Sequence, residues 1–151
     1  MSLNRGMMTS SSDEWTTPGW LFEALDGKFG FSLDPAATPE NALCRTFFTK
    51  EQNGLAQPWT AHRVFVNPPY SQVASWTAKC LVESSRGCPL ICALVPARTD
   101  TKWWHGFAVT ADLIHFVKGR LKFGDGSGTA PFPSALLFWF GLDRMVREGR
   151  P

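Results

Sequence analysis

The sequence predicts an α/β fold in which helices cover a central, mostly parallel β-sheet. Apolar segments typical of strands alternate along the chain with segments of helical spacing. Residues 89–95 (PLICALV) form a continuous apolar run, which is typical of a strand buried on both faces of a parallel sheet. Residues 63–66 (RVFV) end abruptly at Asn67-Pro68-Pro69, because prolines disrupt the interior of a strand. Such alternation produces layered folds with right-handed crossovers, in which ligands bind at the carboxyl ends of the strands.

In the first half of the chain, a short helix is expected over residues 20–28. It follows Pro18, which favours a helix start, and Gly27 can end it. Strands are expected over residues 29–33, 47–48 and 63–66. The first of these strands ends at Asp34 and the last at Asn67, so we expect both side chains at the same edge of the sheet.

In the second half, helices are expected over residues 72–84 and 101–108, and strands over residues 89–95, 112–123 and 134–140. The glycine-rich segment 124–129 is expected to be mobile. Lys118, Arg120 and Lys122 alternate along one of the predicted strands. They form either a basic stripe for DNA or a solvated face.

Composition favours one globular domain. The chain has 151 residues, of which 44% are hydrophobic and 19% are charged. We expect residues 1–12 to be a disordered lead-in and residues 13–151 to form a single domain. No apolar run approaches the roughly 18 residues that span a bilayer, so we expect a cytoplasmic protein that does not associate with membranes.

The cysteines and histidines do not predict a metal site. Four cysteines and three histidines are scattered along the chain without the clustering that zinc requires. Cys88 and Cys92 flank an apolar stretch, and we expect them to be buried free thiols rather than disulfides.

The tetrad Asn67-Pro68-Pro69-Tyr70 has the chemistry to activate a weakly nucleophilic amine. The lone pair of an exocyclic adenine amine is delocalised into the ring, so methyl transfer needs acceptors that hold its N–H bonds. Asn67 offers a side-chain carbonyl and Pro68 a main-chain carbonyl, while the two prolines fix the loop. Tyr70 offers a flat face on which a base can stack. The alternative is an ordinary strand-ending turn.

Asp34 is a second candidate. A carboxylate at the tip of the first strand can reach the amino or hydroxyl groups of a cofactor, and Pro35 and Ala36 are small enough to let the cofactor approach the backbone. The alternative is that Asp34 caps the turn that follows it.

Eight segments, in order, resemble the small phage-type DNA N6-adenine methyltransferase family (Dam-like, with the NPPY motif). The resemblance runs from Asp13 to Phe140. The matching segments are 15–18 (WTTP), 31–37 (FSLDPAA) with 41–42 (NA), 49–55 (TKEQNGL) with Trp59, 67–70 (NPPY), 96–101 (PARTDT), 103–105 (WWH), 119–123 (GRLKF) and 131–135 (PFPSA).

The resemblance implies a Rossmann-like, S-adenosylmethionine-dependent methyltransferase fold and site-specific methylation of adenine in DNA, as in phage modification or restriction-modification systems. It places the protein in the cytoplasm of a host cell. The cofactor-binding residues that it implies are Trp15, Thr17, Pro18, Asp34, Pro35, Ala36, Glu51 and Asn67, with Glu51 on the ribose hydroxyls. The catalytic residues that it implies are Asn67, Pro68, Pro69 and Tyr70. The chain departs from related enzymes in lacking a glycine-rich cofactor loop and an insert long enough for a separate target-recognition domain.

DNA is the expected partner. An arginine beside paired tryptophans suits a phosphate contact next to a stacking platform, and the candidate residues are Arg98, Asp100, Trp103, Trp104 and Arg120. The alternative is a helix start capped by Thr99 or Asp100, with both tryptophans packed inward.

Two other functions are compatible with the tetrad. One is methylation of a glutamine amide in a protein, or of a base in RNA, because these nitrogens pose the same electronic problem. The other is a catalytically silent module on the same fold that binds DNA or a protein partner.

Overall fold

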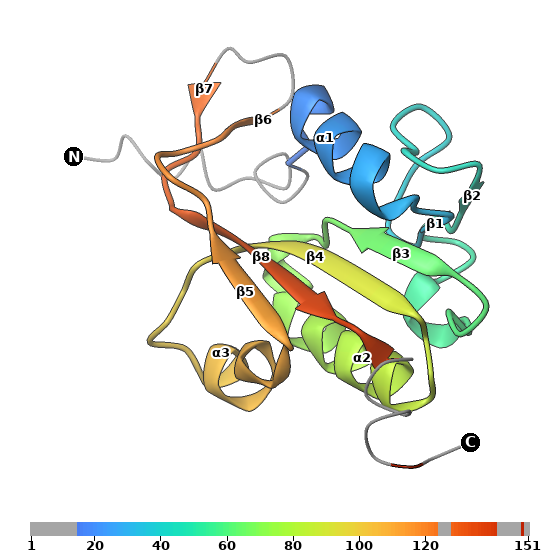
Figure 1. The fold of residues 1–151 in the computed structure, drawn as a ribbon. Helices are drawn as coiled ribbons and strands as arrows, with labels where there is room; N and C mark the ends of the chain where they lie inside the picture. The colour runs from blue at the N-terminus through green and yellow to red at the C-terminus, as the bar shows by residue number, and fades with distance from the viewer. Residues whose placement is uncertain (1–14, 124–127, 142–148, 150–151) are drawn as a thin grey trace.

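Six strands form the central sheet. Their order is β2 (Thr46–Phe47), β1 (Leu33–Asp34), β3 (Arg63–Val66), β4 (Leu90–Pro96), β8 (Ser134–Trp139) and β5 (Leu113–Phe116). The first four are parallel to one another, and β8 lies antiparallel between β4 and β5 (Figure 1). The computed structural model describes residues 15–123, 128–141 and 149. The expected lead-in 1–12 and most of the glycine-rich segment lie outside the described residues. The sheet confirms the predicted α/β class.

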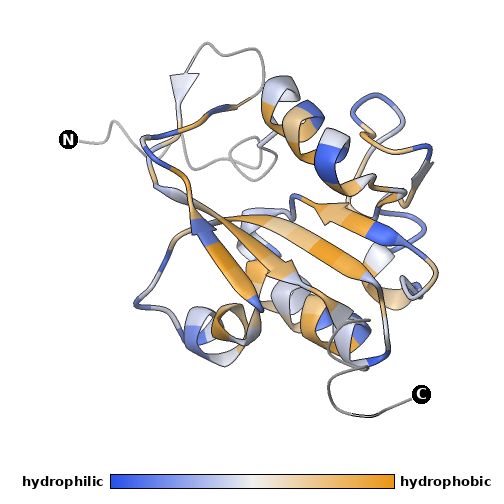
Figure 2. Ribbon diagram, in the orientation of Figure 1, coloured by the Kyte–Doolittle hydropathy of each residue, from blue (hydrophilic) through white to orange (hydrophobic). Residues whose placement is uncertain are grey.

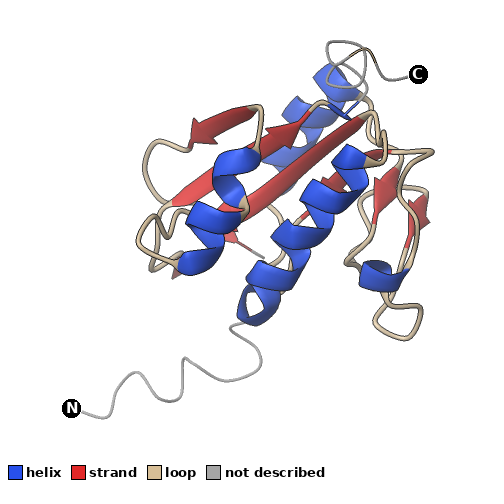
Figure 3. Cartoon of the chain, turned by 90° about the horizontal axis from the view of Figure 1, so that it is seen from below, coloured by secondary structure: helices blue, strands red, loops and turns tan. Residues whose placement is uncertain are grey.

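Helices cover both faces of the sheet. On one face lie α2 (Val73–Ser85) and α3 (Lys102–Gly106), and on the other lie α1 (Gly19–Phe29) and the two-stranded sheet of β6 (Lys122–Phe123) and β7 (Gly128–Thr129) (Figures 1 and 3). Single turns of 3-10 helix occur at η2 (Gly54–Ala56), η3 (Tyr70–Gln72) and η4 (Ala108–Thr110).

The central strands are buried on both faces, as the apolar run predicted. Along β4, Ile91, Ala93 and Val95 pack toward α2 and α3, whereas Cys92 and Leu94 pack toward α1. This alternation follows from the two-residue repeat of a strand, and β4 and β8 are coloured largely as hydrophobic in Figure 2. Each fully buried side chain of this kind contributes roughly 1.5–3 kcal/mol to folding.

Helix α1 extends past its expected end. It continues through Gly27 to Phe29, and Gly30 ends it in the left-handed conformation with φ of 63°. Gly27 can stay helical because glycine costs a helix interior only about 1 kcal/mol. The strand expected over residues 29–33 therefore begins later and is shorter, since β1 covers only Leu33–Asp34. The helix expected over residues 72–84 is confirmed to within one residue by α2.

The strand expected over residues 112–123 is interrupted. β5 ends at Phe116, and Gly119, with φ of 73°, reverses the chain before β6. Lys118 and Arg120 therefore lie outside both strands, so no basic stripe runs along one strand face. Lys118, Arg120 and Lys122 are all exposed, which agrees with the solvated alternative. Alternating residue types predicted a continuous strand, but a glycine at positive φ breaks the ladder.

A buried carboxylate fixes the loop that precedes β3. Glu83 accepts hydrogen bonds from the Trp59 backbone N–H (3.0 Å), Lys79 (2.7 Å) and Arg86 (3.3 Å). Burial acts to raise the pKa of Glu83, but these bonds outweigh it and leave the pKa below its usual value. Trp59, held in this way, donates from Nε1 to the Gly54 carbonyl (3.0 Å).

Gly54 packs so closely that no side chain fits. A Cβ atom at this position would lie 2.0 Å from the Pro35 carbonyl oxygen, whereas a Cβ on Gly27 would have no neighbour within 4 Å. We expect Gly54→Ala to destabilise the fold by roughly 1–3 kcal/mol through overpacking. Gly27→Ala should stabilise it by about 0.5–1 kcal/mol through helix propensity. Urea unfolding measures both changes, and a neutral Gly54→Ala would contradict this packing.

Candidate active site

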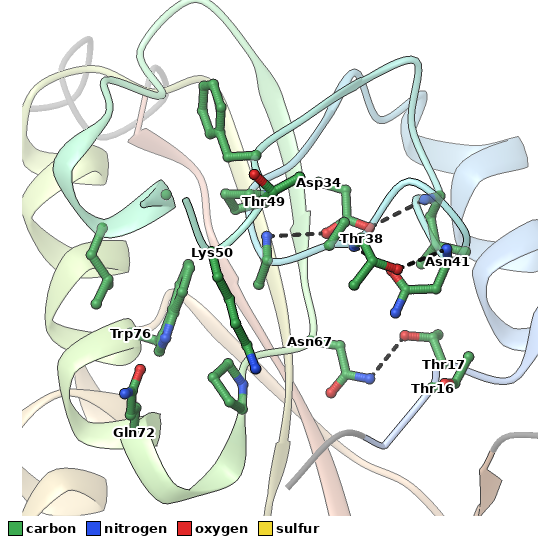
Figure 4. A pocket seen from close by; sticks show the side chains of 18 of the residues that line it. Thr16, Thr17, Asp34, Thr38, Asn41, Thr49, Lys50, Asn67, Gln72 and Trp76 are labelled. Carbon is green, nitrogen blue, oxygen red and sulfur yellow. Dashed lines mark hydrogen bonds between the residues drawn. The ribbon is translucent and has the colours of Figure 1, made fainter. Parts of the chain in front are cut away.

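A pocket of about 400 Å³ opens where β1 and β3 end (Figure 4). Small-molecule sites typically have volumes of about 300–1,000 Å³. The lining residues are Trp15, Thr16, Thr17, Asp34, Pro35, Ala36, Ala37, Thr38, Asn41, Leu43, Phe48, Thr49, Lys50, Asn53, Gly54, Leu55, Asn67, Pro69, Gln72 and Trp76. Asp34 and Asn67 therefore lie in one pocket at the carboxyl edge of the sheet, as the sequence predicted.

Asp34 both holds a loop and faces the pocket. Its two carboxylate oxygens accept hydrogen bonds from the backbone N–H groups of Ala36 (3.3 Å) and Leu43 (3.1 Å), which confirms its role in the following turn. Burial raises the pKa of Asp34 to about 6, although these bonds act to lower it. Above that pH the pocket contains a buried negative charge, which a cationic ligand group would stabilise.

The Asn67 side chain has a fixed orientation. Its Nδ2 donates hydrogen bonds to the Trp15 carbonyl and to the Thr17 hydroxyl, the latter at 3.0 Å. A carbonyl oxygen can only accept, so the amide nitrogen must face Trp15 and the oxygen must face away. Asn67 Oδ1 is buried and has no hydrogen-bond partner among the described residues. Buried acceptors are rarely left unpaired, so this oxygen is suited to a donor supplied by a ligand.

The rest of the tetrad lies beside Asn67. Pro68 is buried, Pro69 lines the pocket, and Tyr70 packs into the core layer next to it. Burial raises the pKa of the Tyr70 hydroxyl well above its usual value, so the group stays neutral. Its oxygen also has no partner within the described part of the chain.

An aromatic cluster joins the tetrad to the second sheet. We call Trp15, Tyr70, Phe123 and Phe132 the aromatic cluster. The ring of Phe132 contacts the Tyr70 ring at 5.2 Å and the Trp15 ring at 5.4 Å, both edge to face. Trp15 also contacts Phe123 of β6 at 5.4 Å. Such pairs are worth roughly 0.5–1.5 kcal/mol beyond area burial, so the cluster fixes the segment that bonds Asn67.

Most of the predicted cofactor-binding residues lie together. Trp15, Thr17, Asp34, Pro35, Ala36 and Asn67 line the pocket, and Pro18 precedes α1 beside them. Glu51 is exposed and is not among the lining residues.

Lys50 lines the pocket instead of Glu51, and the sequence interpretation missed it. Lys50 is the only basic residue, and Asp34 the only acidic one, among the described residues that line the pocket. In the view of Figure 4, the ammonium end of Lys50 lies between Gln72 and Asn67. The sequence could have indicated Lys50 as a candidate, because it belongs to the same TKEQNGL segment (residues 49–55) as Glu51.

The predicted DNA-binding residues divide into two groups. Arg98 is exposed, with its guanidinium 6.0 Å from the centre of the Phe132 ring, and Arg120 and Asp100 are also exposed. Trp104, in contrast, is only 4% exposed and packs in the core, with Trp103 packed against that core.

The paired-tryptophan platform is therefore not formed, and the inward-packed alternative describes these two side chains. The helix cap is Thr101 rather than Thr99 or Asp100, because Thr101 Oγ1 accepts from the Trp104 backbone N–H at 3.3 Å. The tryptophans pack inward because α3 lies against α2, and the Trp104 ring stacks on Phe116 of β5.

Three further features of the described residues bear on the sequence expectations. Cys44, Cys80, Cys88 and Cys92 are free thiols, and the last three are buried. No group of three or more potential metal ligands occurs within residues 15–123 and 128–141. Within the same ranges, no helix has the length and apolar character needed to cross a membrane.

Comparisons with known proteins agree on one family. A model of the DNA N-6-adenine-methyltransferase (Dam) family matches residues 6–134. The chain is 28% identical over 117 residues to the DNA N-6-adenine-methyltransferase of Haemophilus phage HP1, covering 76% of this chain and 68% of that protein. It is 35% identical over 111 residues to the enzyme of the same name from Escherichia phage T1, covering 72% of this chain and 46% of that protein. The chain thus spans about half the length of the T1 protein.

The raised pKa of Asp34 predicts how stability changes with pH. The folded chain, in which the pKa of Asp34 is about 6, binds this proton more tightly than the unfolded chain, in which the pKa is 3.8. Stability should therefore fall as pH rises through this window and level off above it. Between about pH 4.5 and pH 7 the loss due to Asp34 is about 2 kcal/mol. Urea unfolding at these two pH values should show that the wild type loses about 2 kcal/mol more stability than Asp34→Asn as the pH rises. Equal pH dependence of the two proteins would refute the raised pKa.

Proposed function

The chain belongs to the DNA N-6-adenine-methyltransferase (Dam) family, and we propose that it methylates adenine N6 in DNA with S-adenosylmethionine bound in the pocket beside Asn67. The observation that carries this proposal is the buried, unpaired Oδ1 of Asn67. An amide held in this orientation presents an acceptor to an amine at the carboxyl edge of the sheet. The antiparallel β8 in an otherwise parallel sheet is compatible with a Rossmann-like methyltransferase fold contained in a single domain.

The pocket suits the methyl donor in size and in charge. The donor carries an ammonium, a carboxylate and a sulfonium on its methionine end. Asp34 would bind the ammonium, since its ionised carboxylate is buried at the pocket wall. Lys50 would bind the carboxylate, because this group is the only negatively charged group of the donor and the lysine ammonium is positively charged. Trp15 and Thr17 line the side of the pocket on which Asn67 lies. When bound, the donor supplies an electrophilic methyl group.

The tetrad would hold the target amine for in-line attack. Asn67 Oδ1 accepts one N–H of the adenine amine and the Pro68 carbonyl accepts the other, which directs the nitrogen lone pair toward the methyl carbon. The donor would supply the methyl group to this nitrogen, and loss of its carbon–sulfur bond would leave S-adenosylhomocysteine. The methylated nitrogen then loses a proton to water. No strong general base is required, because the amine becomes acidic only once it is methylated.

The adenine must leave the duplex to reach Asn67, at a cost of a few kcal/mol. Tyr70 is the residue of the tetrad that would stack on the extruded base. Arg98 and Arg120, both exposed, would contact DNA phosphates. The guanidinium of Arg98 lies near the Phe132 ring, and the Phe132 ring in turn contacts the Tyr70 ring.

A direct assay tests the proposed reaction. Incubation with isotopically labelled S-adenosylmethionine and plasmid DNA, followed by digestion to nucleosides, should yield N6-methyldeoxyadenosine. Asn67→Ala should lower turnover by at least a hundredfold, since removal of one positioned polar group at a reacting centre costs about that much. Donor affinity, measured calorimetrically, should stay within a few fold of the wild type because Oδ1 acts on the target amine.

Thr17→Val is the matched control for Asn67→Ala. It removes one of the two hydrogen bonds that orient the Asn67 amide but leaves Oδ1 in place, so turnover should fall by less than in Asn67→Ala. Methylation by Asn67→Ala at close to the wild-type rate would reduce the tetrad to a structural turn. Failure of the wild-type protein to label DNA would refute the proposed function.

The role of Lys50 is testable with a donor fragment. We expect Lys50→Met to weaken S-adenosylmethionine binding roughly five- to tenfold at low salt, an effect that shrinks as salt increases because the side chain is partly screened by solvent. Binding of 5′-methylthioadenosine, which lacks the carboxylate, should change by less than twofold. Lys102→Met, on α3 outside the pocket lining, is the control. Equal weakening of both ligands would show that Lys50 does not bind the carboxylate.

A further inference from the structure

Trp20 is the most exposed of the large apolar side chains described in the structure. It is 64% exposed, whereas the next residues of α1, Leu21 and Phe22, are buried. The helix thus directs its apolar stripe inward and leaves one indole in water. Tryptophan is enriched in the surfaces with which proteins bind their partners.

Trp20 lies at the edge of the sheet that carries the pocket. It follows Thr17, which bonds the Asn67 amide, by three residues, and the Leu21 N–H donates to the Pro18 carbonyl at 3.1 Å. The first turn of α1 therefore begins beside the tetrad, and a turn of helix rises only about 5.4 Å. The exposed indole consequently lies within about two turns of helix from the residue that would hold the target amine.

Cations share this edge with Trp20. Figure 1 shows the start of α1 beside β6, and the contact of Trp15 with Phe123 joins the two segments. Lys122 of β6 and Arg120 just before it are exposed. An exposed aromatic ring and cations on neighbouring segments at one edge of the protein are a combination that can bind bases and phosphates.

The neighbours of Trp20 on α1 make a protein partner a poor fit. The exposed side of this helix continues with Glu23, Ala24 and Gly27. The indole is therefore an isolated aromatic group rather than part of an apolar patch, and protein interfaces depend on buried apolar clusters. A flat base face requires only one ring.

We infer that Trp20 stacks on a base beside the gap that the flipped adenine leaves in the duplex. This inference rests on the proposed function. Extrusion of the adenine exposes the faces of the neighbouring base pairs to water, and an aromatic side chain that covers one of them recovers part of the lost stacking. Trp20 thereby favours the extruded state without contacting the reacting atoms, and its contribution applies to duplex DNA alone.

The comparison of duplex and single-stranded substrates tests this role. On a duplex oligonucleotide that the wild type methylates, Trp20→Ala should lower kcat/KM by roughly tenfold, the scale of one base–aromatic stack. On the single strand of the same sequence, the change should be within twofold, because no gap exists to fill. Trp20→Phe should retain most of the duplex activity, and S-adenosylhomocysteine affinity should be unchanged in both variants.

Phe116→Ala is the matched control, because this side chain is 60% exposed on β5. It should affect neither substrate. A second readout does not depend on methyl transfer: Trp20→Ala should bind a duplex with an abasic site in place of the target adenine about tenfold more weakly than the wild type does.

The outcomes separate this inference from the proposed function. Equal losses by Trp20→Ala on duplex and single strand would overturn gap stacking in favour of a general DNA contact or a folding defect. No loss on the duplex would overturn it outright. If the wild type does not methylate DNA at all, the proposed function fails, and the abasic duplex still decides whether Trp20 stacks.

Discussion

The hydrogen bonds from the Asn67 amide to the Trp15 carbonyl and the Thr17 hydroxyl are the constraint on which the site depends. They link segments about fifty residues apart in the chain, so the site exists only once α1 has packed on the sheet. Because Asn67 Nδ2 donates to the Trp15 carbonyl, Asn67 Oδ1 must point away from Trp15. The aromatic cluster reinforces the same link by packing Trp15 against Phe132, which also contacts Tyr70. Donor-side and acceptor-side residues are thus placed by one set of contacts.

The pocket is shaped without a glycine-rich loop because side chains hold its backbone. The Asp34 carboxylate bonds the N–H groups of Ala36 and Leu43, and thereby fixes the segment between them. On the opposite wall, Glu83 holds Trp59, which holds the Gly54 carbonyl. Gly54 is required by close approach to Pro35 and not by an unusual φ, since a Cβ atom would meet the Pro35 carbonyl.

The sequence predicted the elements that are dictated by local chemistry and missed those decided by tertiary packing. Apolar runs and prolines are local signals, so β3, β4 and the position of Asn67 at a strand end were predicted correctly. The end of α1 and the break after β5 depend on whether Gly30 and Gly119 take positive φ, which composition does not reveal. Trp104 is buried because its helix packs against α2 and its ring stacks on Phe116 of β5, contacts that no local pattern shows. Whether Lys50 or Glu51 faces the pocket depends on the backbone conformation of one turn. A resemblance that covers the whole segment does not show which of the two side chains points inward.

Two polar groups of the pocket, the Asp34 carboxylate and Asn67 Oδ1, lower the stability of the fold. Burial of Asp34 costs free energy, since desolvation raises its pKa to about 6 while the protein must keep it ionised at neutral pH. The hydrogen bonds from the Ala36 and Leu43 backbone N–H groups offset part of that cost. Under the proposed function, the ammonium of the donor would offset more of it on binding. The unpaired Asn67 Oδ1 follows the same logic, because under the proposed function the target amine would supply its missing hydrogen bond. These two features, one electrostatic and one in hydrogen bonding, would correspond to the two reactants of the proposed reaction, and their positions in one pocket would bring the reactants together.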